Sequence, residues 1–235
     1  MNNDSDFETY IYLGENKFVI SSFSKINNQL SFKDEYYFDD LQNKIKYNDQ
    51  LHVFLNNNIF KLEKKNNEFI KDITLIVNNE CLLSIYLGLK KNLFTNQVTE
   101  KDKINILADM KNYLKKNYQE HFIIHLIITN HYFNELITED YNKDNVSYDF
   151  SLEANFIIIS KEKFSFYEQI FKNYHITISS IISGTYAQNY FKDKQIDECE
   201  MGFKIKGGCN PNEILLVKKD KLNIGFFEKF FNFFS

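Results

Sequence analysis

Residues 152–191 read LEANFIIISKEKFSFYEQIFKNYHITISSIISGTYAQNYF, and this stretch decides the fold class. One apolar run ends at Ser160 and a second ends at Ser183. Both runs have the length and composition of buried strands. Between them, apolar side chains recur every three or four residues, as they do on one face of a helix. A helix between two strands of parallel type predicts a βαβ unit, and therefore an α/β or α+β protein.

The rest of the chain supplies further strands and helices. Two β-rich runs meet at residues 13–16, which predicts a hairpin. Thr99 stands before acidic Glu100 and Asp102, and the apolar residues that follow have helical spacing, which predicts a helix that starts here. The other predicted elements are a strand at 29–38, a helix at 48–64, buried strands at 71–79 and 81–89, a long strand at 121–134, a strand at 151–160, a helix at 161–174, a buried strand at 175–183 and a short helix at 184–191.

The composition is that of a folded protein and argues against nucleic-acid binding. Apolar residues make up 43% of the 235 residues and aromatic residues 17%, which excludes an intrinsically disordered chain. The net charge is −4, and all 28 basic residues are lysine. A duplex-binding surface needs dense positive charge and favours arginine. No apolar run reaches the ~20 residues that a membrane-spanning helix needs.

Cysteine and histidine residues give no sign of a metal centre. The three cysteines, Cys81, Cys199 and Cys209, form no C-x-x-C pair, and their odd number favours a reducing cytosol. His121 and His125 fall on one face of the long strand, but a zinc site would need a third ligand and a polar pocket. We therefore expect both histidines to be structural.

Two stretches resemble the N-terminal half of FtsA, a bacterial cell-division family in the actin-like ATPase superfamily. They are VTEKDKINILADMKNYLKKNYQEHFIIHLIITNHYF at 98–133 and the stretch at 152–191 quoted above. The resemblance extends over about residues 8–218 and rests on the order and spacing of the elements. It implies an α/β fold with an actin-like (RNase H-like) subdomain 1A and an inserted subdomain 1C of the SHS2 type. The implied bounds are 1–75 and 150–218 for 1A, 76–149 for 1C and 219–235 for a C-terminal tail.

In this family two glycine-containing loops hold the phosphates of ATP, and the first has its counterpart at residues 12–17. Gly14 and Lys17 match the family pattern. Tyr12 stands where the family has the aspartate that works near the metal. Glu15 stands where it has a phosphate-binding hydroxyl, and the charge of Glu15 would repel a phosphate.

The second loop has its counterpart at residues 204–210, which we expect to be a glycine turn between two short strands. Lys204 replaces the family's aspartate and Lys206 replaces a glycine, so no carboxylate is left to bind Mg²⁺. A turn with solvated lysines is the alternative to a relic of a phosphate loop. The resemblance thus implies no catalytic residue, no metal, no cofactor and no ATP hydrolysis, with a degenerate nucleotide site at Gly14, Lys17, Gly207 and Gly208.

The last residues, IGFFEKFFNFFS at 224–235, predict an amphipathic helix. At about 100° per residue the six phenylalanines fall on one arc, which is typical of a helix lying in a membrane interface. FtsA proteins use such a tail to hold the cytoplasmic face of the cell membrane. A helix packed on the protein's own sheet and a partner-binding segment are the alternatives. The expected membrane-binding residues are Phe226, Phe227, Lys229, Phe230, Phe231 and Phe234.

The sequence leaves three functions to compare. The first is an FtsA-like scaffold without ATPase activity that recruits or organises division proteins at the septum and self-associates through subdomain 1C. The family's second half, which contacts FtsZ, has no counterpart here, so FtsZ is not among the expected partners. The second is an adaptor of the PilM type, which binds a peptide of a membrane partner in pilus assembly. The third, an actin-like ATPase or sugar kinase, would require intact aspartate-containing loops.

Overall fold

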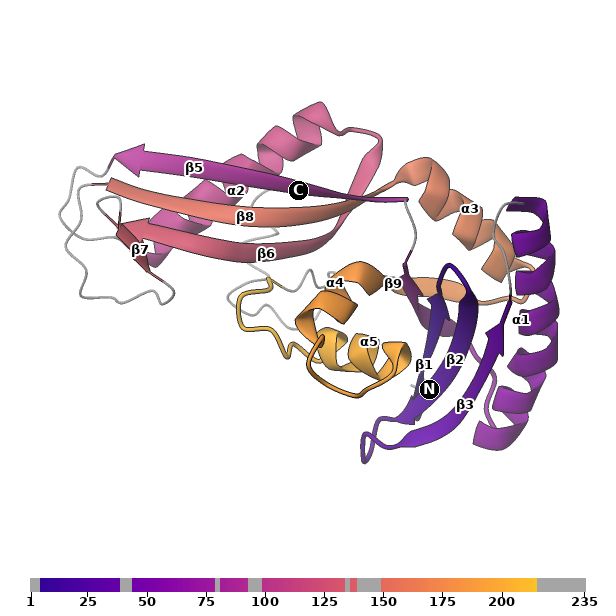
Figure 1. Ribbon diagram of the computed structural model, residues 1–235. Coiled ribbons are helices and arrows are strands. Elements are labelled where there is room, and N and C mark those ends of the chain that lie inside the picture. The colour runs from indigo at the N-terminus through magenta and orange to yellow at the C-terminus, as the bar shows by residue number, and fades with distance from the viewer. Residues whose placement is uncertain are drawn as a thin grey trace. The chain divides into compact units, whose positions relative to one another are not determined.

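Figure 1 shows the computed structural model of the protein, which describes residues 5–38, 44–78, 81–92, 99–133, 136–138 and 149–214. The chain divides into two compact units. The first is Met1–Leu82 with Ser160–Cys209, and the second is Leu83–Ile159 with the residues from Asn210 onward. Each unit combines a β-sheet with helical structure, so the predicted α/β class is confirmed. Within the described ranges, no helix is long and apolar enough to cross a membrane.

The first unit contains a five-stranded sheet in the order β3-β2-β1-β4-β9. β1 (Phe7–Leu13) and β2 (Lys17–Ser24) form the predicted hairpin, and β3 (Leu30–Tyr37) pairs antiparallel with β2. β4 (Asp72–Val77) runs parallel to β1 and to β9 (Thr177–Ser183). Leu13 lies opposite Val77, and Val77 lies opposite Ser183. The three parallel strands therefore end together at one edge of the sheet.

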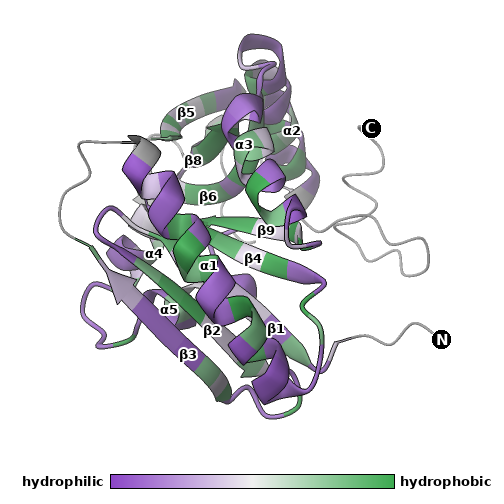
Figure 2. Ribbon diagram, turned by 90° about the vertical axis from the view of Figure 1, so that its right-hand side faces the viewer, coloured by the Kyte–Doolittle hydropathy of each residue, from purple (hydrophilic) through white to green (hydrophobic). Residues whose placement is uncertain are grey.

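Helices cover both faces of this sheet, because successive residues of β1, β2 and β4 are buried on both sides, whereas β3 is largely polar (Figure 2). α1 (Lys44–Asn66) packs on β2 and β3, where the ring of Phe54 lies 5.7 Å from the ring of Phe18. α3 (Lys161–Lys172) contacts β9. α4 (Gly184–Tyr190) and α5 (Glu198–Lys206) cover the other side of β1 and β4, in a core that contains Tyr10, Tyr12 and Cys199.

The second unit contains a four-stranded sheet in the order β5-β8-β6-β7 and one long helix. Its strands are β5 (Leu82–Asn92), β6 (His121–Phe133), β7 (Leu136–Thr138) and β8 (Asp149–Ser160). α2 (Glu100–Asn117) begins at the predicted Thr99, whose hydroxyl accepts a hydrogen bond from the backbone N–H of Asp102 in a full capping box. The apolar face of α2 packs on β6 and β8 around the buried Met110 and Phe156.

Two predictions about strand placement are wrong. β8 and β9 lie in different sheets, so α3 does not join two strands of one βαβ unit, and residues 150–159 belong to the second unit. β5 is not a buried strand: it lies at an edge of its sheet, and Tyr86 is 71% exposed. An apolar run predicts a strand, but it does not predict which sheet the strand joins or whether the strand lies at an edge of that sheet.

The predicted strand and turn at residues 201–210 are also wrong. Residues 198–206 form α5, with Asp197 at its N-cap and Gly207 at its C-cap. An N-cap aspartate with Glu200 three residues later, and a Gly-Gly pair after the last turn, are start and stop signals of a helix. The predicted tail at 219–235 lies outside the described residues.

Candidate functional site

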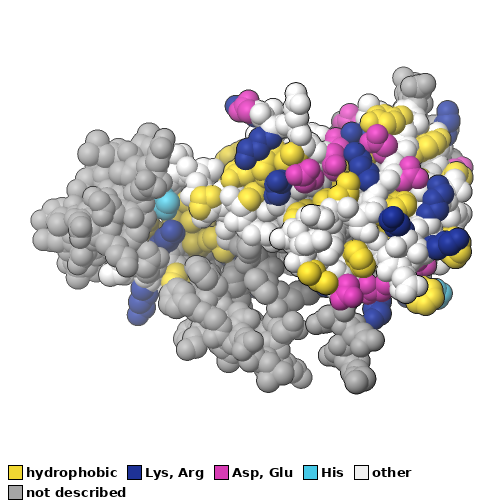
Figure 3. Space-filling model, turned by 90° about the horizontal axis from the view of Figure 1, so that it is seen from below, with side chains coloured by type: hydrophobic (Ala, Val, Ile, Leu, Met, Phe, Trp, Pro, Cys, Tyr) yellow, Lys and Arg dark blue, Asp and Glu magenta, His cyan; other side chains and the backbone are white. Residues whose placement is uncertain are grey.

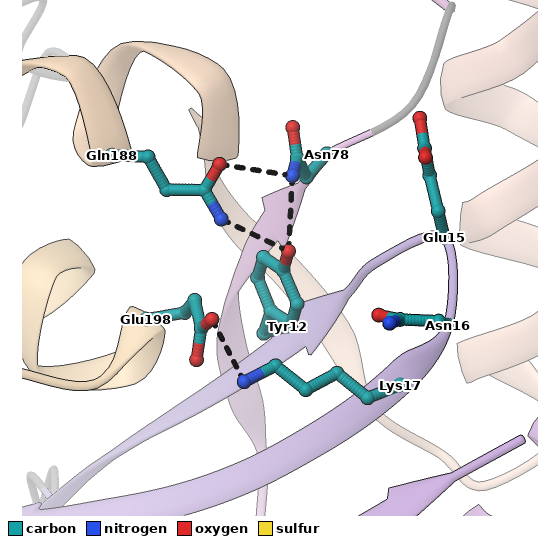
Figure 4. Close-up of a pocket in the computed structure, with 7 residues that line it drawn as sticks. All are labelled: Tyr12, Glu15, Asn16, Lys17, Asn78, Gln188 and Glu198. Atoms are coloured by element: carbon teal, nitrogen blue, oxygen red, sulfur yellow. Dashed lines mark hydrogen bonds and ion pairs between the residues drawn. The ribbon is translucent and has the colours of Figure 1, made fainter.

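A polar pocket of about 360 Å³ lies at the edge of the first sheet where β1 and β4 end (Figure 4). Ligands of open α/β sheets bind at this edge, beyond the carboxyl ends of parallel strands. The pocket is formed by the end of β1, the β1–β2 turn, the residue after β4, α4 and the first residue of α5. Its lining residues are Tyr12, Glu15, Asn16, Lys17, Asn78, Gln188 and Glu198.

The hydroxyl of Tyr12 is the centre of a hydrogen-bond network in this pocket. It accepts from Asn78 Nδ2 at 3.0 Å and from Gln188 Nε2 at 3.3 Å. Asn78 Nδ2 also donates to Gln188 Oε1, and Thr185 Oγ1 donates to Asn78 Oδ1. Burial raises the pKa of Tyr12, and the carboxylate of Glu198 adds to this effect while the hydrogen bond from Asn78 opposes it. The network joins β1, β4 and α4 through neutral groups.

The ring of Tyr12 also fills the space against the β1–β2 turn. A Cβ built on Gly14 would lie 2.5 Å from Cε1 and 2.8 Å from the hydroxyl oxygen of Tyr12. Any side chain at this position would therefore displace the ring. In this structure the absence of a side chain at Gly14 makes room for Tyr12.

Lys17 is paired inside the protein. Its Nζ lies 2.8 Å from Glu198 Oε1 and 5.9 Å from the centre of the Tyr12 ring. Burial lowers the pKa of Lys17, but the hydrogen bond and the charge of Glu198 outweigh it, so the pKa is raised overall. Lys33 on β3 forms a second ion pair with Asp197, at 3.5 Å. The two pairs tie the start of α5 to the β1–β2–β3 meander.

The four predicted nucleotide-binding residues are not brought together. Gly14 and Lys17 are at the pocket, whereas Gly207 and Gly208 follow the other end of α5, which rises about 13 Å over nine residues. The N–H groups of Gly207 and Gly208 donate to the carbonyls of Phe203 and Ile205 at the end of that helix. These amides are therefore already used by the helix cap.

The two lysines that precede Gly207 and Gly208 also form ion pairs within the protein. Lys204 pairs with Glu200 one turn away on α5, at 3.0 Å. Lys206 pairs with Glu8 on β1, at 3.2 Å. Lys206 thus joins α5 to β1, whereas Lys204 is paired within the helix.

Sequence reasoning missed Asn78, Gln188 and Glu198 at this site. A signal was available for Glu198, because it follows the N-cap Asp197, and helix starts are common ligand positions. Asn78 follows a buried strand, which is also a usual place for a site residue. Nothing in the sequence marks Gln188.

The two histidines do not share a site with other metal ligands in the described part of the chain. His125 is buried, and its Nδ1 lies 2.6 Å from Glu213 Oε1. The segment around Glu213 runs along β6, where Ile214 N donates to Leu126 O. His125 therefore joins β6 to the segment that follows α5, and no group of three or more metal-binding side chains occurs among the described residues.

No protein-family model and no curated protein matches this chain. Among solved structures, a PilM–PilN type IV pilus biogenesis complex aligns with 80% of this chain at 7% identity and a TM-score of 0.48. The cytoplasmic domain of EpsL, an inner-membrane component of the type II secretion system of Vibrio cholerae, aligns with 77% at 8% identity and a TM-score of 0.39. A Bacteroides thetaiotaomicron protein of unknown function with an actin-like ATPase fold aligns with 82% at 12% identity and a TM-score of 0.32.

These alignments span 49%, 57% and 58% of the three solved chains, so this chain corresponds to about half of the length of each. At such scores and identities the likeness assigns no function.

Proposed function

We propose that this chain is a non-catalytic scaffold at the cytoplasmic face of the cell membrane, with an actin-like sheet whose nucleotide site is filled by its own side chains. The observation that carries the proposal is the placement of Tyr12. Its ring covers Gly14 and its hydroxyl binds Asn78 and Gln188, at the sheet edge where a nucleotide phosphate would be expected.

The charges of the pocket support the same conclusion. Lys17 is the only basic residue among the described residues of the lining, and it is held by Glu198, while Glu15 adds a second negative charge. A phosphate would have to displace the Glu198 carboxylate from Lys17 and remain close to both acids. We therefore infer a Mg-ATP affinity weaker than millimolar and no ATP hydrolysis.

The finer assignment is a scaffold of the cell-division machinery. It rests on the resemblance of residues 98–133 and 152–191 to the FtsA family and on the apolar tail at 224–235. Each fully buried phenylalanine contributes about 2–3 kcal/mol, so several of them suffice to hold the tail in a membrane interface. The partners would be other division proteins and further copies of this chain.

Lysine and acidic side chains are interspersed on the face shown in Figure 3, in keeping with the net charge of −4. A nucleic-acid partner needs a continuous basic surface. Protein and lipid partners therefore fit the charge of this chain better.

The tail supplies the test of the membrane role. We predict that Phe227→Glu with Phe230→Glu releases the full chain from phosphatidylcholine–phosphatidylglycerol vesicles in a sedimentation assay, because carboxylates are costly in the acyl boundary. Raising the salt concentration should release the wild type only partly, since screening weakens lysine attraction and leaves apolar burial intact. A matched control, Asn232→Glu with Ser235→Glu, adds the same charge on the polar arc and should stay bound.

The same variants test the place of action in the cells that encode the protein. A fluorescent fusion of the wild type should concentrate at the septum, and the Phe227→Glu, Phe230→Glu variant should disperse. Concentration at pilus bases would instead favour the PilM-type adaptor. A double variant that sediments like the wild type would contradict the membrane role.

A further inference from the structure

β5 forms one edge of the second sheet, and its residues 82–89 lack the charged side chains and prolines that often keep natural edge strands from pairing. Such strands are protected by shortness, charge, bulges or proline. β5 has eleven residues, and residues 82–89 contain neither a charged residue nor a proline. β3, at an edge of the other sheet, carries Lys33, Asp34 and Glu35 in its middle. The contrast indicates that β5 is an edge suited to pairing.

The side chains of β5 are exposed and apolar. Tyr86 is 71% exposed, Leu83 46% and Leu89 36%. Ile85 and Leu87 point to the opposite face from Tyr86 and pack against the core beneath α2. A neighbouring strand would therefore extend that core past Ile85 and Leu87 and cover Leu83 and Leu89.

We propose that β5 pairs antiparallel with β5 of a second copy of this chain, with Tyr86 of each copy opposite Tyr86 of the other. This register sets Leu83 opposite Leu89 and Ile85 opposite Leu87, so the face of the strand that carries these four residues is apolar across the whole pair. The contact has two-fold symmetry and is therefore closed. The inference does not rest on the proposed function.

The lysines at the end of β5 favour this direction of pairing. Lys90 and Lys91 follow Leu89, and in the antiparallel arrangement they lie beyond Ser84 of the other copy, opposite Leu82 and Cys81. A parallel arrangement would place each lysine opposite its own counterpart, which is unfavourable. The antiparallel direction thus keeps the lysines of the two copies apart.

Sedimentation equilibrium of the full chain over a range of micromolar concentrations tests the proposal. We expect the wild type to form dimers and Tyr86→Lys to weaken them at least about tenfold, because two like charges then face each other at the symmetry axis. Mixing Tyr86→Lys with Tyr86→Glu should restore association, because residue 86 of one copy faces residue 86 of the other. Phe69→Lys, which changes a 78% exposed side chain of the first unit in the same way, is the matched control and should not alter the dimer.

Several results would overturn the proposal. A wild type that stays monomeric would leave β5 to a strand of another protein. A Tyr86→Lys variant that associates like the wild type would show that the contact lies elsewhere. The apolar tail at 224–235, which every variant retains, would then be one candidate. A mixture of the Lys and Glu variants that fails to associate would contradict the register at Tyr86.

Discussion

Tyr12 shows what a single residue at the end of β1 does to the candidate site. The sequence identifies the departure from the family pattern, because an aromatic residue stands where an aspartate is expected. It does not identify the partners of the hydroxyl, which are 66 and 176 residues away in the chain. Hydrogen bonds between distant amide and hydroxyl groups leave no local pattern. The sequence therefore predicts that this position departs from the family pattern, but it does not predict which groups surround the Tyr12 hydroxyl.

Tyr10, two residues earlier on β1, gives a prediction about pH. Burial, followed by the hydrogen bond to Glu8 and the charge of Glu8, raises the pKa of Tyr10 above that of an ordinary tyrosine. The unfolded chain loses this proton near pH 10, whereas the folded chain keeps it. The folded state then binds more protons than the unfolded state, so the free energy of unfolding falls as the pH rises above about 10.

We predict that Tyr10→Phe reduces this alkaline decline by up to about 1.4 kcal/mol per pH unit, because it removes one titrating group. Urea denaturation at a series of pH values from about 8 to about 11.5 measures the slope of the unfolding free energy against pH. This range brackets the ordinary tyrosine pKa of about 10. Tyr113→Phe, at an exposed position of α2, should leave the slope unchanged. Equal slopes for wild type and Tyr10→Phe would contradict the assignment.

At the scale of the element, α5 is where the sequence was misread and where the structure is most informative. The glycine pair at 207–208 suggests a turn between strands, as a relic of a phosphate loop or a plain turn, but Asp197 and Glu200 at the other end mark the same segment as a helix. A local pattern can serve two structures, and packing selects between them. Here α5 buries Cys199 and Ile205 against β1, which a strand and turn would not achieve.

Gly202 on α5 gives a test of this packing. A Cβ at Gly202 would lie 2.4 Å from Ile76 Cδ1 on β4, and Ile76 is fully buried. Alanine would favour the helix by about 1 kcal/mol, but the overlap with the core should outweigh this gain. We predict that Gly202→Ala lowers the free energy of unfolding by about 1–3 kcal/mol in urea denaturation.

Gly207→Ala is the matched control at the end of the same helix. A Cβ there would meet its nearest neighbours at 3.4 Å, and the backbone φ of −73° suits any residue. This variant should be neutral within about 0.5 kcal/mol. If both alanine variants were equally stable, α5 would not be packed on β4 as closely as described.

At the scale of the whole molecule, the elements were more predictable than their assembly. The hairpin, the capped helix α2 and the long strand β6 follow from local patterns and were predicted. The division into two sheets could not be predicted from local patterns. β8 and β9 are both apolar runs, and only the strands that they pair with show that they belong to different sheets. Strand pairing depends on contacts between residues that are far apart in the chain, and these determine where the pocket forms.

We propose that Tyr12 fills the place where a nucleotide phosphate would bind, and that the Lys17–Glu198 pair neutralises it. Calorimetric titration of the full chain with Mg-ATP tests this claim most directly, with Lys17→Ala as the companion variant. We predict that neither protein gives a binding isotherm below about 1 mM, which corresponds to about −4 kcal/mol. A micromolar dissociation constant for the wild type that is lost in Lys17→Ala would contradict the claim, because it would show that Lys17 leaves Glu198 to bind a phosphate.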